Sequence, residues 1–191
     1  MTNTDNISLH TRHGLPDALH VLLDAYPRDG WGDDPGFDAL IRFWLDRHLM
    51  FRRLLDEMQT TTTRLLDHNM EPERYAAAVS RYGGRFVNGL HEHHTIEDTL
   101  YFPKLMHHES RIARGFDILE ADHHALDTHL SDFVSAANAT IGGHGDRDTL
   151  QDNAGGLKRE LDLLEKLLNR HLLDEEDLIV PVLLKFGSPQ M

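Results

Sequence analysis

One short segment occurs twice in the chain, and the residues that repeat are of types that bind metal ions. The segments HHTIEDTLYFP and HLLDEEDLIVP begin at His93 and His171, and in register they also align Glu97 with Glu175. A histidine followed four residues later by a glutamate presents both side chains on one face of a helix, a single turn apart. Each pair can therefore bind one metal site, and two pairs facing each other can bind two ions.

The rest of the chain consists mainly of long helical patterns. Apolar residues recur with the helical period in four stretches, and no stretch alternates with the period of a strand. The predicted fold class is all-α, an up-down-up-down antiparallel four-helix bundle with a short extra N-terminal helix. Pro103 is expected to kink the second bundle helix, because proline lacks an amide donor and crowds the preceding turn. The bundle helices are expected over residues 35–69, 72–108, 111–140 and from about 148 or 157 to 186.

Two more histidines, His48 and His123, lie in the middle of the apolar faces of the first and third predicted helices. In an antiparallel bundle, facing residues lie at equal distances from the turn that joins their helices. The midpoints between successive histidines fall near residues 70, 108 and 147, in or beside the predicted turns, so all four are expected near one level. The candidate metal ligands are His48, His93, Glu97, His123, His171 and Glu175.

Four imidazoles and two carboxylates, with no sulfur, suit iron or manganese, and by raw affinity zinc or copper. A pair of six-coordinate ions has more positions than six residues can fill. Glu97 and Glu175 lie on separate helices, where each can bridge two ions, and an oxo, hydroxo or water ligand would fill much of the rest. The alternative is a metal-free bundle, which would bury six polar groups at one level, each costing about 1–3 kcal/mol unless paired.

The sequence divides into an N-terminal extension, residues 1–34, and the bundle, residues 35–188. Residues 1–14 are polar and are expected to be loosely held. Residues 15–26 have the apolar pattern of a short helix with Pro16 in its first turn. The extension is expected to cap the bundle or to cover an entrance to the metal site.

The overall composition excludes several classes of partner. A formal charge of −13 over 191 residues opposes binding to nucleic-acid phosphates and to anionic membrane surfaces. The chain has no cysteine, which rules out disulfides and thiolate metal sites. No signal peptide and no apolar stretch long enough for a membrane span are visible. We therefore expect a cytoplasmic protein with no nucleic-acid or membrane partner.

These motifs together closely resemble the hemerythrin-like, or HHE cation-binding, family. The family pattern is a lone histidine, then HxxxE, then a lone histidine, then HxxxE on four antiparallel helices, and the resemblance covers roughly residues 35 to 186. The resemblance implies a cofactor of two non-haem iron ions, a di-iron centre with an oxo, hydroxo or water bridge. It also implies that the partner is a small diatomic ligand, O2 or NO, or peroxide.

One position departs from the pattern of the oxygen-carrying hemerythrins. These have a second histidine four residues after the first on the third helix, where this chain has Asp127. The second iron then lacks one histidine, gains a carboxylate or keeps a water, and His94 is an alternative extra ligand. The departure disfavours simple reversible O2 carriage. It favours sensing, peroxide or NO chemistry, or an oxidase reaction.

Three functions are compatible with such a centre, and the sequence leaves open whether the protein is an enzyme. The first is O2 or NO binding in sensing or in a redox or oxidative-stress response, with output to a redox or signalling partner protein. The second is a di-iron enzyme, an O2-activating oxidase or a peroxidase or catalase-like protein. The third and least favoured is iron storage or delivery. Manganese or zinc as the native metal and the oligomeric state also stay open.

Overall fold

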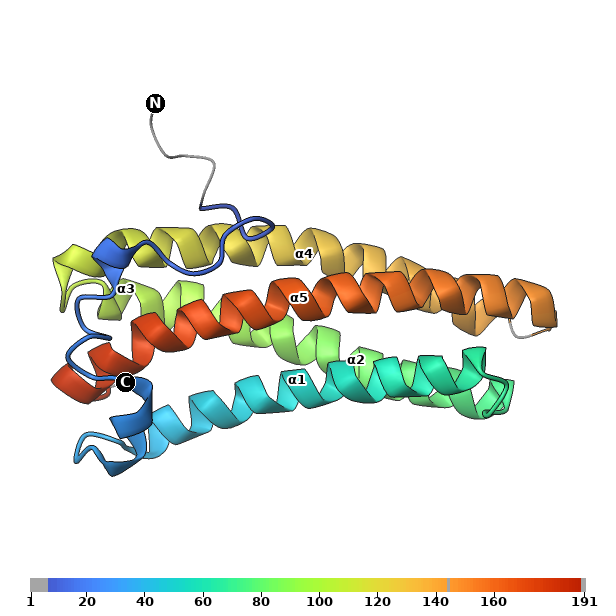
Figure 1. The fold of residues 1–191 in the computed structure, drawn as a ribbon, viewed down its shortest axis with the longest axis horizontal. Helices are drawn as coiled ribbons and strands as arrows, with labels where there is room; N and C mark the ends of the chain where they lie inside the picture. Colours follow the sequence, from blue (N-terminus) through green and yellow to red (C-terminus); the bar gives the residue numbers. More distant parts are fainter. Residues whose placement is uncertain (1–6, 144, 190–191) are drawn as a thin grey trace. The chain divides into compact units, whose positions relative to one another are not determined.

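The protein is described by a computed structural model over residues 7–143 and 145–189 (Figure 1). These residues are predominantly helical and include no strand, which confirms the all-α prediction. The arrangement is consistent with a four-helix bundle whose long helices are α1, α2, α4 and α5. In chain order the elements are the 3-10 helices η2 (Asp17–Leu19) and η3 (Arg28–Asp33), α1 (Ala39–Leu66), α2 (Pro72–Ile96), the π-helix η4 (Glu97–Tyr101), α3 (Phe102–Leu105), the 3-10 helix η5 (Ser110–Ile112), α4 (Ala113–Gly142) and α5 (Arg147–Phe186).

Caps at both ends make α1 shorter than the predicted 35–69. The side chain of Asp38 accepts hydrogen bonds from the amides of Leu40 at 2.9 Å and Ile41 at 3.1 Å, as an N-cap residue does. At the other end His68 has a φ of 58°, in the left-handed region, and the Asn69 amide donates to the Arg64 carbonyl at 2.8 Å. A left-handed residue just beyond the last turn is a common way to end a helix.

The second predicted helix, which was expected to kink at Pro103, is interrupted by a π-helical turn just before that residue. The α-helical hydrogen bonding of α2 stops at Ile96, and the π-helical turn η4 intervenes before the short α3. A proline cannot donate to the carbonyl four residues earlier and its ring crowds that carbonyl, so the preceding turn widens. The aligned Pro181 lies inside α5 without such an interruption. The two copies of the repeated segment therefore fold differently around their aligned prolines, Pro103 and Pro181.

Helix α5 begins at Arg147, the earlier of the two predicted starts. The carboxylate of Asp146 accepts a hydrogen bond from the Thr149 amide at 3.0 Å and so caps the first turn. Gly155 and Gly156, which lie between the two predicted starts, are within the helix. None of the described helices is both long enough and apolar enough to cross a membrane.

The chain forms two compact units. The first comprises Met1–His48, His93–Ala125 and Leu167–Met191, and the second comprises Leu49–Glu92 and Leu126–Lys166. The proposed domain boundary between residues 34 and 35 stays a prediction.

Unit 1 contains a continuous apolar core to which the N-terminal segment contributes. Leu19 and Trp31 of that segment pack in one cluster with Trp44 of α1 and with apolar residues of α3, α4 and α5. Gly36 is needed for this packing, because a Cβ there would lie 2.6 Å from the carbonyl oxygen of Leu184. The glycine allows the linker before α1 to lie against the end of α5.

Unit 2 has a core of its own, built around three aromatic rings. Phe86 packs edge to face against Phe51, with ring centroids 6.3 Å apart, and against Phe133 at 6.1 Å. All three side chains are at most 1% exposed. Rings in this geometry bury a large apolar area and add a small favourable electrostatic contribution.

The N-terminal extension differs from two predictions. The helix expected over residues 15–26 is reduced to η2 and a series of hydrogen-bonded turns. A helix of this length is marginal by itself, and here its apolar side chains are drawn into the core of unit 1 instead. The expectation that residues 1–14 are loosely held is also wrong for the part that the structure describes, because Leu9 and Arg12 are buried. Residues 1–6 lie outside the described ranges.

Candidate metal centre

The six residues predicted as metal ligands all lie in unit 1 and are all buried. They come from α1, α2, η4, α4 and α5, and none has more than 9% of its surface exposed. Glu97 is the first residue of the π-helical turn η4, so the interruption before Pro103 determines where its carboxylate points. Together with His94, they form two groups of side chains that could each hold a metal ion.

The first group consists of His48, His93, Glu97 and Glu175, with one nitrogen or oxygen atom of each within 4.8 Å of the others. Nε2 of His48 lies 3.1 Å from Nε2 of His93 and 3.2 Å from Oε1 of Glu175. Nε2 of His93 lies 3.0 Å from Oε1 of Glu97. Two ligands at right angles on one ion, each bound at about 2.1 Å, are separated by about 3 Å. These spacings therefore fit adjacent ligands of one metal ion.

The second group consists of three imidazoles, those of His94, His123 and His171, whose ligand nitrogens also lie within 4.8 Å of one another. The rings of His94 and His123 are stacked, with centroids 3.9 Å apart, and the ring of His171 meets both edge to face. His94 was predicted only as an alternative ligand. The structure places it fully inside the group.

The two glutamates of the first group also approach the second group. Glu97 has Oε1 3.0 Å from His93 in the first group and Oε2 3.6 Å from Nε2 of His123 in the second. Glu175 has Oε1 3.2 Å from His48 in the first group and Oε2 3.4 Å from Nε2 of His171 in the second. Each carboxylate thus offers one oxygen to each group, which is the arrangement that a bridging carboxylate requires.

In three of the histidines, a carboxylate lies beside Nδ1 and orients the ring. Nδ1 of His48 lies 2.9 Å from Glu176, Nδ1 of His123 lies 2.8 Å from Asp98, and Nδ1 of His171 lies 3.2 Å from Asp122. A carboxylate that accepts from Nδ1 leaves Nε2 as a lone-pair donor facing the other ligands. Asp98 and Glu176 directly follow Glu97 and Glu175 in the two repeated segments, whereas Asp122 lies outside both segments.

Trp44 also contacts the site, through Glu175. Its Nε1–H donates a hydrogen bond to Oε1 of Glu175, and its ring lies edge-on to that of Tyr101 at a centroid distance of 4.9 Å. Trp44 stands four residues before His48, so both side chains lie on the same face of α1. The ring packs in the core and the N–H holds one oxygen of the carboxylate.

Several buried ligand atoms at this place have no hydrogen-bond partner among the described residues. They are both ring nitrogens of His94, both carboxylate oxygens of Glu97, Nε2 of His123, Nε2 of His171 and Oε2 of Glu175. A buried polar atom without a partner costs about 1–3 kcal/mol. Such a concentration of lone pairs, all from imidazole and carboxylate, fits cation binding.

A sequence model of the hemerythrin HHE cation-binding domain matches residues 39–183, which contain every residue of both groups. The chain belongs to the hemerythrin HHE cation-binding domain family. Comparisons with curated proteins and with solved structures found no match. The family predicted from the two HxxxE segments is therefore confirmed, and its cation-binding character agrees with the two groups of ligand atoms.

Burial and neighbouring charges shift the pKa values within this HHE domain in different directions. Burial lowers the pKa of His93 and His94 well below that of free imidazole. Burial also opposes protonation of His171, but the neighbouring carboxylates of Asp122 and Glu175 outweigh it and raise the pKa to about 9. Burial and the negative charge of Glu175 raise the pKa of Glu97 well above its usual value. A divalent cation would stabilise the carboxylates and compete with protons for the imidazoles.

Asp127, the position at which this HHE domain departs from the oxygen carriers, is exposed and belongs to neither group. The third imidazole of the second group comes from α2 instead of α4. The sequence indicated this possibility, because a second histidine, His94, directly follows His93. The direction of the second side chain depends on the helix packing, which spacing alone does not give.

Proposed function

We propose that the protein is a hemerythrin-like metalloprotein with two non-haem iron ions, which binds or reacts with O2, peroxide or NO in sensing or in a redox or oxidative-stress response. The observation that carries this proposal is the position of Glu97 and Glu175. Each offers one oxygen to each of two separate groups of imidazoles. A single-ion site has no use for two such carboxylates, whereas a pair of ions does.

The ligand atoms suggest an assignment of residues to the two ions. His48 and His93 would hold one ion, His94, His123 and His171 would hold the other, and the two glutamates would contact both. Imidazole and carboxylate ligands suit iron, and in helical bundles such sets commonly hold di-iron centres. When bound, the pair of irons supplies redox chemistry and positions at which a small oxygen or nitrogen ligand can bind.

The residues of the chain would prepare the site for this chemistry. Asp98, Asp122 and Glu176 keep three imidazoles in the tautomer and orientation that direct Nε2 inward. The N–H of Trp44 holds Oε1 of Glu175. The aromatic rings of Trp44 and Phe102, each 4% exposed, exclude water from the ligand atoms.

Burial favours a small reactant. Every candidate ligand is at most 9% exposed, so the centre suits a diatomic molecule or peroxide better than an extended substrate. This supports a binding or sensing role. A di-iron enzyme that turns over peroxide or O2 has the same small reactants and is the alternative, and iron storage is less favoured because the groups account for two ions.

The test is to load metal-free protein with Fe(II) under anaerobic conditions, count iron per chain, and record absorption and Mössbauer spectra before and after O2, NO or peroxide. We expect about two irons per chain and spectral changes with O2 or NO. His171→Ala should lose most of the iron, whereas His20→Ala, outside the groups, should keep it. Iron well below one per chain, or equal retention in both variants, would contradict the proposal.

The same experiment separates the functional alternatives. A spectral change that reverses when O2 or NO is removed supports binding and sensing. Continuous consumption of peroxide or O2 supports the enzyme, and loading far beyond two irons per chain supports storage. The up-down-up-down topology, the cytoplasmic location, the partner protein and the lack of nucleic-acid and membrane partners stay predictions.

A further inference from the structure

The N-terminal segment, residues 7–33, carries two arginines that reach carboxylates beside the candidate metal centre. The first, Arg12, is buried with 4% of its surface exposed. Its Nη1 donates to Oδ1 of Asp122 at 2.7 Å, its Nη2 donates to the other oxygen of the same carboxylate, and its Nε donates to Asp174 at 2.7 Å. Two parallel hydrogen bonds between guanidinium and carboxylate hold the carboxylate in one orientation.

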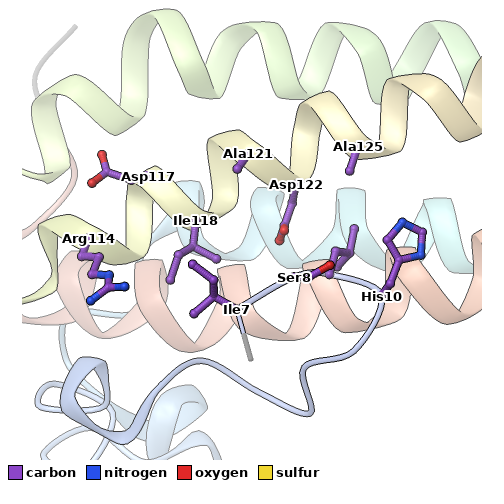
Figure 2. Close-up of a pocket in the computed structure, with 10 residues that line it drawn as sticks. Ile7, Ser8, His10, Arg114, Asp117, Ile118, Ala121, Asp122 and Ala125 are labelled. Carbon is purple, nitrogen blue, oxygen red and sulfur yellow. The ribbon is translucent and has the colours of Figure 1, made fainter. Parts of the chain in front are cut away.

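Asp122 in turn contacts a candidate ligand. Its Oδ2 lies 3.2 Å from Nδ1 of His171, whose Nε2 faces Glu175. Figure 2 shows Asp122 extending from α4 toward the part of the segment that contains Ile7 and His10. A cavity of about 390 Å³ lies between that part of the segment and α4. Asp122, which accepts hydrogen bonds from Arg12, is one of the residues that line this cavity.

The second arginine makes an equivalent connection to the other group. Arg28 donates from Nη1 to Oε2 of Glu176 at 2.8 Å and from Nε to Asp177 at 2.6 Å. Oε1 of Glu176 lies 2.9 Å from Nδ1 of His48. The guanidinium of Arg28 also lies over the ring of Trp31, 4.9 Å from the centroid, and Trp31 is part of the unit 1 core. The two contacts therefore tie the segment to both ligand groups.

The two connections are built alike. In each, an arginine of the segment contacts a carboxylate on a long helix, and that carboxylate contacts Nδ1 of a histidine. Nε2 of the same histidine faces Glu175. Asp98, which orients His123, is contacted by neither arginine. His123 thus provides an internal comparison, an imidazole oriented by its carboxylate without help from the segment. Without the guanidinium, Asp122 would be a buried carboxylate missing its main partner, free to turn away from His171.

We propose that residues 7–33 act as a positioning element for the metal centre, in which Arg12 and Arg28 hold the carboxylates that orient His171 and His48. The inference rests on the proposed metal binding and adds a role for a segment that lies before the matched HHE domain, residues 39–183. Because the segment and the metal stabilise the same side-chain positions, each must strengthen the binding of the other. Residues 7–33 therefore dock more firmly when metal is bound.

The test uses the full chain and Co(II), whose visible absorption reports the geometry of its ligands. Arg12→Ala, Arg12→Lys and Arg28→Ala are compared with Arg111→Ala. Arg111 is the control, an exposed arginine that also pairs with a carboxylate of unit 1, Glu109, at 2.7 Å through both Nε and Nη2. The other partner of that carboxylate among the described residues is Lys185, which is not a candidate ligand. Affinity is measured by competition with a chelator, and spectra are recorded at saturating Co(II).

Loss of a carboxylate that orients a metal-binding imidazole typically weakens metal affinity about 10–100-fold. We expect a loss within that range for Arg12→Ala and a smaller one for Arg28→Ala, each with an altered Co(II) spectrum. Arg12→Lys keeps the charge but not the paired hydrogen bonds, so it should still show an altered spectrum. Methylguanidine should partly restore the spectrum of Arg12→Ala. Arg111→Ala should match the unmodified protein in affinity and spectrum.

Hydrogen exchange provides a second measurement, made on the unmodified protein and on Arg28→Ala. In the unmodified protein, Co(II) should slow amide exchange in residues 7–33, and Arg28→Ala should reduce this protection. If Co(II) binds with unchanged affinity and spectrum to Arg12→Ala and Arg28→Ala, or leaves exchange in the segment unaltered, the positioning role is wrong while the metal centre stands. If the unmodified protein binds neither Co(II) nor Fe(II), both the proposed function and this inference are wrong.

Discussion

His94 stacks on His123, with ring centroids 3.9 Å apart and planes only 9° from parallel. Both nitrogens of His94 are buried without a hydrogen-bond partner among the described residues. A histidine that served only to pack would leave two polar atoms unsatisfied, at a cost of about 1–3 kcal/mol each. The stacking therefore holds in place an imidazole whose nitrogens suit a metal ion.

Replacing His94 by phenylalanine separates the two roles of this ring. His94→Phe keeps a flat ring for stacking on His123 and removes the nitrogen donors. We expect the iron content to fall from about two to about one per chain, with little loss of thermal stability in the metal-free protein. The control is His91→Phe, at an exposed position on the same helix, which should keep about two irons per chain. Two firmly bound irons in His94→Phe would show that the ring packs without binding metal.

The charge of Glu175 is expected to matter to both ions. Glu175→Gln keeps the shape of the side chain but replaces an anionic oxygen by an amide nitrogen, which is not a metal ligand. Since one oxygen faces each group, the affinity for both ions should fall, by at least about tenfold. Isothermal titration with Fe(II) under anaerobic conditions measures it. The comparison is Glu165→Gln, an exposed glutamate on the same helix, which should bind as the unmodified protein does.

Trp44 is expected to tune the centre without holding a metal. Trp44→Phe removes the N–H that donates to Glu175 and keeps an aromatic ring in the core. We expect two irons per chain, with a shifted absorption spectrum and reduction potential, because Oε1 of Glu175 then donates more electron density to its ion. An unchanged spectrum and potential would mean that the hydrogen bond has no influence on the centre.

Metal binding should release protons at neutral pH. The pKa of His171 in the metal-free protein is raised to about 9, so both of its ring nitrogens are protonated at pH 7, and Nε2 offers a lone pair only after one proton has left. A metal-bound imidazole must give up one proton, and the apparent affinity should therefore rise with pH up to about 9, by as much as tenfold per pH unit for each proton released. Calorimetry in buffers of different ionisation enthalpy counts the protons. Affinity independent of pH between 6 and 8 would contradict the raised pKa.

Phe133 should contribute strongly to the stability of unit 2. Its ring is 1% exposed and packs against Phe86. Phe133→Ala would remove a large buried side chain and leave a cavity, which typically costs about 3–5 kcal/mol. Urea unfolding of the metal-free protein measures this change. The neighbouring Val134, 36% exposed, provides the control, and Val134→Ala should change the free energy of unfolding by less than about 1 kcal/mol.

Much of the candidate centre could be predicted from spacing. His93 with Glu97 and His171 with Glu175 recur at a helical interval, and that interval by itself places each pair on one face. His48 and His123 could be added because they occupy the core positions of apolar helical series. All six residues do lie together in unit 1. Local periodicity was sufficient here because a helix converts sequence spacing directly into direction in space.

Other features depend on contacts between residues far apart in the chain. His94 is one residue from His93, so helical geometry alone turns it about 100° away, and only the packing of α2 beside α4 and α5 brings its ring onto His123. Arg12 reaches Asp122 across 110 positions, which no local pattern reports. The widened turn that begins at Glu97 follows Pro103, whereas Pro181 leaves α5 continuous. The sequence by itself therefore determined the helices, their buried faces and the six ligand candidates, because these depend on local period. Only the tertiary structure decided the second imidazole group and the arginine contacts, because these depend on which helix faces meet and on the burial that makes such polar contacts necessary.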